Sequence, residues 1–232
     1  MIEPRLYLSS TEMALDPRTA RVRAPVGTVQ LDGNLQIPPA ARAIVVFAHG
    51  SGSGRHSPRN RFVAGELSKA GLATMLVDLL TPEEEAIDLQ TAELRFDIAL
   101  LAERLGGVTD WVASETATAA LSVGYFGAST GAAAALIAAA DRPQAVRAIV
   151  SRGGRPDLAM AVLSSVRQPT LLIVGGADEV VIDLNRQALD QLGGVKRLVI
   201  VPGATHLFEE PDALEQVASV ASEWFGKYLA PP

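Results

Sequence analysis

The chain has no cysteine among its 232 residues. Disulfide bonds, catalysis by a thiolate and zinc sites built on cysteine are therefore excluded. The compartment is left open by this absence, because both cytosolic and exported proteins can lack cysteine.

An excess of positive charge and long apolar runs are also missing. Lys and Arg number 20 against 26 Asp and Glu, which gives a formal net charge of -6. A nucleic-acid surface needs clustered Lys and Arg, so we expect no nucleic-acid partner. The alanine-rich stretch 132–140 is shorter than a membrane span, and the first residues lack the basic-then-apolar pattern of a signal peptide. We expect no membrane association and a cytoplasmic location.

The pattern that is present is that of an α/β protein. Short alternating runs at 26–31 and 34–37 flank Asp32 and Gly33, a dipeptide that favours a hairpin turn. From residue 43 onward, continuous apolar runs alternate with helix-forming segments, as in a parallel, doubly wound sheet covered on both faces. We expect strands at about 43–48, 72–78, 121–126, 146–151, 169–174 and 196–201, and helices at about 59–70, 91–105, 130–140, 156–166, 184–192 and 211–229.

These segments predict a single domain over residues 1–232, with an N-terminal antiparallel hairpin region at 1–41, a parallel core at 42–230 and no large cap domain. The acidic residues 83–85 indicate a solvated loop. Because this loop follows the carboxyl end of a strand, Leu79 and Leu80 are candidates to line a substrate pocket.

The segment 127–131 reads Gly-Ala-Ser-Thr-Gly and joins an apolar run to a helix-forming run. A serine between two glycines at such a junction sits on a tight turn that pushes its hydroxyl out above the sheet. Ser129 is therefore a candidate nucleophile. The alternative is that Ser129 is only a helix N-cap in a glycine-rich turn.

Two further groups follow the next strands in the order of a serine hydrolase. Asp178 ends the turn after the predicted strand 169–174, and His206 follows the strand 196–201. Each residue alone is compatible with an ordinary turn or loop. Their joint position at the carboxyl edge of the sheet predicts a catalytic triad with Ser129.

A fourth element is the His-Gly-Ser-Gly-Ser-Gly run that begins at His49, after the strand 43–48. Such a turn directs backbone N–H groups toward the nucleophile, and we assign Ser51 and Thr130 as the oxyanion donors. His49 is then expected to brace the turn. No Gly-Lys-Ser/Thr follows, which argues against a nucleotide-binding loop.

Together, these motifs resemble the α/β-hydrolase superfamily over roughly residues 25–230, and the compact length resembles its dienelactone hydrolase-like branch. The resemblance implies the α/β-hydrolase fold. Dienelactone hydrolases proper carry cysteine where this chain has Ser129, so dienelactone is not transferred as the substrate. Hydrolase domains with a loop similar to residues 50–60 also occur joined to phosphoribosyltransferase domains, and we expect no such partner domain within these 232 residues.

Two basic clusters follow strands at the same edge of the predicted sheet. Arg55, His56 and Arg59 follow the oxyanion turn, and Arg152 and Arg155 follow the strand 146–151. Their side chains either hold a carboxylate or phosphate of the substrate or form a structural cluster of ion pairs. The sequence leaves both interpretations open.

We therefore expect hydrolysis of a small-molecule ester or lactone through an acyl-enzyme, with no metal and no organic cofactor. Acyl transfer or peptide cleavage on the same triad is one alternative. A non-catalytic ligand-binding protein that kept the fold is another. The oligomeric state is not indicated.

Overall fold

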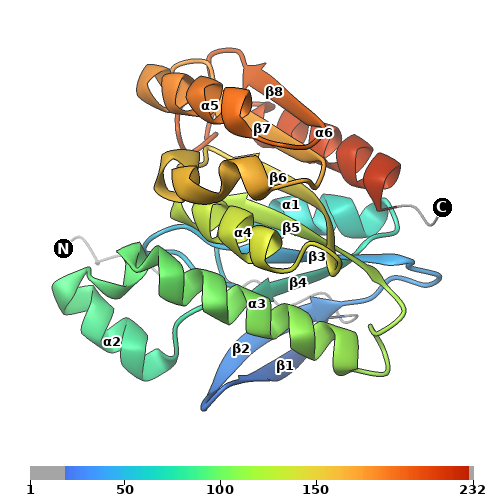
Figure 1. Ribbon diagram of the computed structural model, residues 1–232. Coiled ribbons are helices and arrows are strands. Elements are labelled where there is room, and N and C mark those ends of the chain that lie inside the picture. Colours follow the sequence, from blue (N-terminus) through green and yellow to red (C-terminus); the bar gives the residue numbers. More distant parts are fainter. Residues whose placement is uncertain (1–18, 230–232) are drawn as a thin grey trace, which may run out of the picture.

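The computed structural model describes residues 19–229, and within this range one sheet has eight strands. The strands are β1 (Thr19–Val26), β2 (Val29–Gln36), β3 (Ala43–Ala48), β4 (Ala73–Val77), β5 (Ser122–Ala128), β6 (Val146–Arg152), β7 (Thr170–Gly175) and β8 (Lys196–Val201). Their order in the sheet is β1-β2-β4-β3-β5-β6-β7-β8 (Figure 1). The β1–β2 and β2–β4 pairs are antiparallel and all other pairs are parallel, which confirms the predicted fold class.

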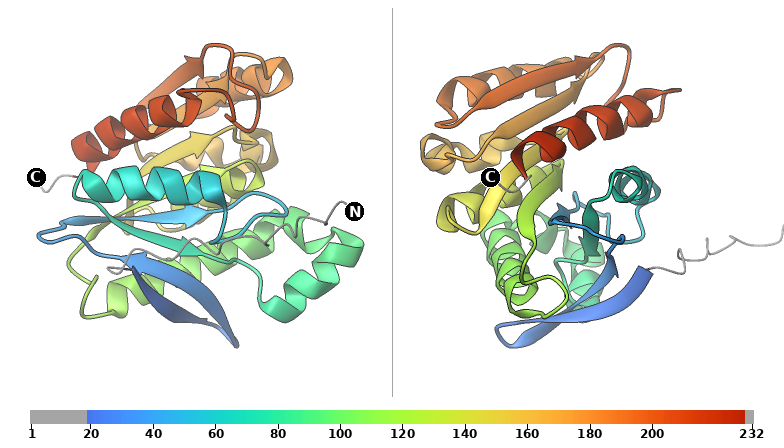
Figure 2. Two further views of the ribbon diagram at one scale, coloured as in Figure 1. Left: turned by 180° about the vertical axis from the view of Figure 1, so that it is seen from behind. Right: turned by 90° about the vertical axis from the view of Figure 1, so that its right-hand side faces the viewer.

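Helices cover both faces of this sheet (Figures 1 and 2). One face carries α3 (Ile98–Ser114), α4 (Thr130–Asp141), α5 (Glu179–Gln191) and the 3-10 helix η2 (Pro156–Ser165), and the other carries α1 (Pro58–Lys69) and α6 (Ala213–Tyr228). Every residue of β3 and β7 is buried, because each lies in the middle of the sheet between two helical layers. No helix among residues 19–229 combines the length and the apolar character that crossing a membrane requires.

The hairpin is present, but the turn predicted at Asp32 and Gly33 is wrong. The chain turns at residues 27–28 instead, where Gly27 has a φ of +56°. Asp32 lies inside β2 and accepts a hydrogen bond from Nε of Arg23 on β1 at 3.2 Å. A Cβ on Gly33 would come within 3.0 Å of the Met75 side chain. The glycine is therefore needed for strand packing and not for the turn.

The solvated loop predicted at residues 83–85 is also wrong, because these residues form the first turn of α2 (Pro82–Thr91). The Thr81 hydroxyl accepts from the N–H of Glu84 at 3.2 Å, and the Glu84 carboxylate accepts from the N–H of Thr81 at 2.8 Å. Acidic residues in a first turn also interact favourably with the helix dipole. The capping box was readable from the Thr-Pro-Glu-Glu sequence.

Three other helix predictions need correction. The helix predicted at 91–105 is replaced by the short 3-10 helix η1 (Leu94–Phe96) and by α3, which begins after Asp97 caps it through the N–H of Leu100 at 3.0 Å. Residues 156–165 form a 3-10 helix, and α5 begins five residues before the predicted 184. The six parallel-region strands and the other three predicted helices lie within two residues of their predicted bounds.

Candidate active site

Ser129 lies on a strained junction between β5 and α4. Its φ is +50° and its ψ is -121°, a conformation that few residues other than glycine adopt. Although Ser129 occupies the N-cap position of α4, its side chain makes no capping hydrogen bond. The geometry thus disfavours the interpretation of Ser129 as a simple helix cap.

Close backbone contacts explain the glycines around this junction. A Cβ on Gly131 would lie 2.3 Å from the carbonyl oxygen of Ala48 and 2.4 Å from that of His49. A Cβ on Gly50 would lie 2.9 Å from the Cβ of Ser129. The turn after β3 and the turn after β5 therefore touch through their backbones, which places the first turn directly beside Ser129.

Asp178 and His206 form a short, partly buried pair. The Asp178 Oδ2 is 2.7 Å from the His206 Nδ1, and the two side chains are 15% and 38% exposed. Asp178 is the N-cap residue of α5, yet its side chain makes no capping bond. The nearby Asp183 instead pairs with Arg186 at 3.2 Å on the surface. Of these two aspartates, Asp178 is the one directed to the histidine.

The loops that carry this pair are joined by backbone hydrogen bonds. The N–H of Ala177 donates to the carbonyl of Ala204 at 2.9 Å, and the N–H of Gly176 donates to that of Val201 at 2.8 Å. A Cβ on Gly175 would lie 2.3 Å from the Ala204 carbonyl oxygen. This contact leaves no room for a side chain at the end of β7.

The loop after β6 connects the histidine with the nucleophile. The His206 Cε1 lies 3.5 Å from the position that a Cβ on Gly153 would take. The carbonyl of Arg152, the preceding residue, accepts the N–H of Ser129 at 3.2 Å. Ser129 and His206 therefore both lie against the end of β6, at residues 152 and 153.

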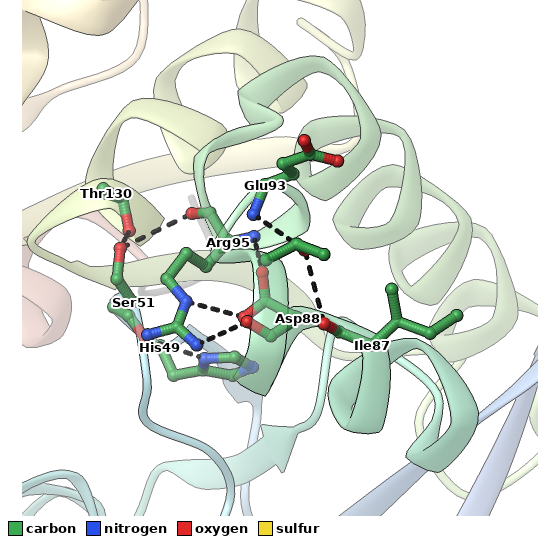
Figure 3. A network of polar contacts seen from close by, with 9 residues as sticks. His49, Ser51, Ile87, Asp88, Glu93, Arg95 and Thr130 are labelled. Atoms are coloured by element: carbon green, nitrogen blue, oxygen red, sulfur yellow. Dashed lines mark hydrogen bonds and ion pairs between the residues drawn. The ribbon is translucent and has the colours of Figure 1, made fainter.

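The predicted oxyanion residues also meet. The Ser51 hydroxyl is 3.0 Å from that of Thr130 and 3.5 Å from the carbonyl oxygen of Arg95 (Figure 3). Thr130 is the first residue of α4, so its N–H lies at the positive end of that helix. Residues 79 positions apart in the sequence are thereby brought together beside Ser129.

His49 links the oxyanion turn to the end of β4. Its Nε2 accepts the N–H of Leu79 at 3.1 Å, so the ring proton lies on Nδ1 and donates to the Gly50 carbonyl at 3.1 Å. Burial lowers the pKa of His49, more than the backbone bond to Gly50 and the charges of nearby acids raise it. This histidine is a neutral brace for the turn.

A pocket with a volume of about 60 Å³ opens beside Ser51. The enclosed part of this space fits a small group. Leu80, Leu89 and Leu101 supply its apolar wall. Leu79, predicted as a lining residue, is completely buried in the core, and that prediction is wrong.

Sequence reasoning missed the polar wall of this pocket, which α2 and η1 provide. The Arg95 Nε donates to the buried Asp88 carboxylate at 2.6 Å, and its Nη2 donates to the Asp88 carbonyl at 2.9 Å (Figure 3). Asp78 and Glu85 also line the pocket. The only sequence signal was the capping box of α2, which places Asp88 on that helix.

Most of the basic residues predicted to bind substrate have carboxylate partners. Arg55 pairs with Asp78, and its Nη2 lies 3.5 Å from Asp32. Arg155 donates to both carboxylate oxygens of Asp157 at 2.8 and 2.7 Å. These contacts favour the structural interpretation for Arg55 and Arg155.

The other three members of the two basic clusters differ from one another in exposure and pairing. His56 is exposed. Arg59 pairs with Glu209 at 2.9 Å on the surface. Arg152 is only 8% exposed, and no carboxylate among residues 19–229 pairs with it.

Over the same residues, no group of three or more histidine and acidic side chains is placed to hold a metal ion.

Comparison with known proteins places this site in a family. The profile of the dienelactone hydrolase family matches residues 31–228. The crystal structure of a dienelactone hydrolase from Anabaena variabilis ATCC 29413 is 62% identical, covers 92% of this chain and all of its own, and superimposes with a TM-score of 0.90. An α/β serine hydrolase homologue from Coxiella burnetii, 18% identical over 90% of this chain and 99% of its own, has a TM-score of 0.73 and shares the fold.

Two curated Mycobacterium tuberculosis sequences, from strains H37Rv and CDC 1551, are 57% identical over 223 residues. Their names assign them provisionally to the phosphoribosyl transferases. The match covers 95% of this chain and 49% of theirs, so the chain spans about half the length of these relatives. The family profile and the Anabaena structure together show that this chain belongs to the dienelactone hydrolase family, within the hydrolases of the α/β-hydrolase superfamily.

Proposed function

We propose that this protein is a serine hydrolase that cleaves an ester or lactone of a small molecule through an acyl-enzyme. The observation that carries the proposal is the 2.7 Å contact between Asp178 and His206 at the sheet edge where Ser129 occupies its strained turn. A carboxylate at Nδ1 holds the imidazole with its other nitrogen, Nε2, free to accept a proton. Ser129 is the nucleophile whose proton His206 accepts.

The reaction has two steps on these residues. The Ser129 Oγ attacks the carbonyl carbon while His206 accepts its proton, and the N–H groups of Ser51 and Thr130 stabilise the negative oxygen that forms. The bond to the leaving alcohol then breaks, and His206 gives its proton to that oxygen. Water attacks the acyl-enzyme by the same route, which releases the acid and restores Ser129.

Serine makes this machinery more dependent on its base than cysteine would. A serine hydroxyl is hardly ionised at neutral pH, whereas a few per cent of a free thiol is. The acid–base pair is therefore essential here. The pocket wall of Leu80, Leu89 and Leu101 supports an uncharged, apolar group on the part of the substrate that enters it.

The test is covalent labelling followed by kinetics. A fluorophosphonate probe should label the wild-type protein and fail to label Ser129→Ala, which should lose at least about 10³-fold in esterase rate. Ser219→Ala, an exposed serine on α6, is the control and should behave as wild type. Labelling that persists in Ser129→Ala would overturn the proposal.

A panel of chromogenic esters, thioesters and amides would then separate the alternatives. Hydrolysis of esters without transfer to added alcohols or amines supports the proposed activity. Preferential transfer to an acceptor would favour an acyltransferase, and preferential amide cleavage a peptidase. Absence of labelling and of turnover would favour a non-catalytic binding protein.

A further inference from the structure

Arg152 is a buried cation, and no carboxylate in the part of the chain that the structure describes pairs with it. It is 8% exposed, and its Nε and Nη1 are buried without a hydrogen bond. Its guanidinium carbon lies 5.6 Å from the centre of the Phe208 ring, which supports the side chain but does not neutralise it. Burial, followed by the charge of Arg59, lowers the pKa of Arg152 to about 10, so the group remains charged at neutral pH.

A second cation, Arg59, is close enough for its charge to lower the pKa of Arg152, and its partner Glu209 directly follows Phe208 in the chain. Arg59 is in the first turn of α1, at the positive end of that helix dipole. Its Nε is buried without a hydrogen bond. Its Nη1 pairs with Glu209 at 2.9 Å, with the two side chains 29% and 63% exposed. A pair this exposed is weak, and another anion can compete for it.

The other arginines near the candidate active site have no such deficit. Arg95 is neutralised by Asp88, Arg55 by Asp78 and Arg155 by Asp157. A buried charge without a counter-ion destabilises the fold. Arg152 and Arg59 therefore carry a local excess of positive charge that an anion would neutralise.

We propose that Arg152 and Arg59 form a binding site for a phosphate-type oxyanion. Two guanidinium groups provide the N–H donors that a phosphate dianion binds in proteins, and the N-terminus of α1 adds the positive end of its dipole. On binding, the oxyanion displaces the Glu209 carboxylate from Arg59 and bonds to Arg152. The carboxylate of Glu209 returns to solvent, which costs little because it is already largely exposed.

The site lies next to the proposed catalytic residues. Phe208, beneath the Arg152 guanidinium, is two residues after His206, and the Arg152 carbonyl accepts the N–H of Ser129. The oxyanion is therefore either free phosphate or a phosphate group carried by the substrate. Oxyanion binding does not depend on catalysis, whereas a phosphate-bearing substrate rests on the proposed esterase function.

The experiment measures the affinity for inorganic phosphate by calorimetry and by thermal unfolding, with sodium chloride at matched ionic strength as the reference. We expect Arg152→Met to weaken phosphate binding at least about tenfold, because it removes the charge-assisted bonds. Glu209→Gln should bind phosphate about three- to tenfold more tightly, because it removes the competing carboxylate. Arg186→Met and Glu66→Gln, which break exposed ion pairs elsewhere, should match wild type.

Equal phosphate affinity in wild type, Arg152→Met and Glu209→Gln would overturn the proposal. Arg59→Met provides the same test, with the same expected loss, if Arg152→Met fails to fold. The Ser129→Ala variant should bind phosphate normally, so a failure of the esterase assignment leaves this measurement unaffected.

Inhibition kinetics then identify the source of the oxyanion. Phosphate that competes with a neutral ester indicates that the site accepts a phosphate group of the substrate. Binding that depends on Arg152 without inhibition indicates free phosphate as the ligand. Both results support the oxyanion site.

Discussion

Replacing Asp178 by asparagine separates the role of its charge from that of its shape. The two side chains have nearly the same size, so the fold should be retained. At 2.7 Å, the contact with His206 is a charge-assisted hydrogen bond that strengthens to an ion pair when the imidazole is protonated in the transition state. Such a bond contributes about 1.5–3 kcal/mol.

The substitution has a second effect on the ring. An amide N–H at residue 178 can face the His206 Nδ1 only if the ring proton moves to Nε2, and Nε2 then cannot accept the proton of Ser129. The two effects together give about 4–5 kcal/mol, or about 10³- to 10⁴-fold in kcat.

The assay is the steady-state hydrolysis of a chromogenic ester, combined with urea unfolding of each variant. Asp183→Asn is the matched control, because Asp183 is 68% exposed and pairs with Arg186. Asp183→Asn should change the rate less than twofold, in line with the small effect of exposed ion pairs. Equal losses in the two variants, with folding intact, would refute the assignment of Asp178.

Three further predictions follow from backbone contacts, burial and the pocket. Gly175→Ala should lower the free energy of unfolding by about 1–3 kcal/mol, because its Cβ would lie 2.3 Å from the Ala204 carbonyl oxygen. Gly226→Ala, in α6 with open space around its Cβ, should raise it by about 0.5–1 kcal/mol in the same urea titration. His49→Gln should flatten the pH dependence of the free energy of unfolding. Burial lowers the pKa of His49 in the folded state, so the unfolded state binds a proton that the folded state does not. The free energy of unfolding of the wild type should therefore fall below about pH 6.5, by up to about 1.4 kcal/mol per pH unit. Parallel slopes for the two proteins between pH 7.5 and 5 would contradict this. Leu89→Ala should reduce kcat/KM about fivefold for esters whose acyl group reaches the pocket wall and leave acetate esters unchanged. Ile87→Ala, on the same helix but outside the pocket lining, should affect neither, and a loss as large as that of Leu89→Ala would show that the pocket does not select the acyl group.

The position of the candidate site was predictable because its signals are local. A serine between glycines at a strand-to-helix junction can adopt few backbone conformations, and the apolar runs before Asp178 and His206 identify the strands that carry them. Since the carboxyl ends of parallel strands lie at one edge of the sheet, the parallel direction of these strands predicted that the three residues lie at that edge. The assignment of Ser129, Asp178 and His206 to catalysis remains a prediction.

Two of the errors arose where an element depends on distant contacts. The Asp-Gly dipeptide carries a hairpin signal, yet Gly33 is inside β2 because Met75 on the neighbouring strand leaves no room for a side chain. Leu79 and Leu80 are adjacent in the sequence, but only Leu80 faces the pocket, since His49 holds the N–H of Leu79 in the core. Which of two adjacent side chains at a bend faces the pocket depends on the tertiary contact that holds the bend, so the sequence alone does not show it.

The amino-acid sequence by itself determined the order of the parallel-region strands, the doubly wound class and the positions of the motifs, because backbone sterics and apolar periodicity act over a few residues. Tertiary structure alone decided which charges are neutralised. Arg55, Arg59, Arg152 and Arg155 are equivalent in the sequence, and only packing gives three of them carboxylate partners and buries Arg152 where no carboxylate of the described residues pairs with it. Ion pairing depends on which side chains from distant segments come within about 4 Å, and that distance is set by the fold.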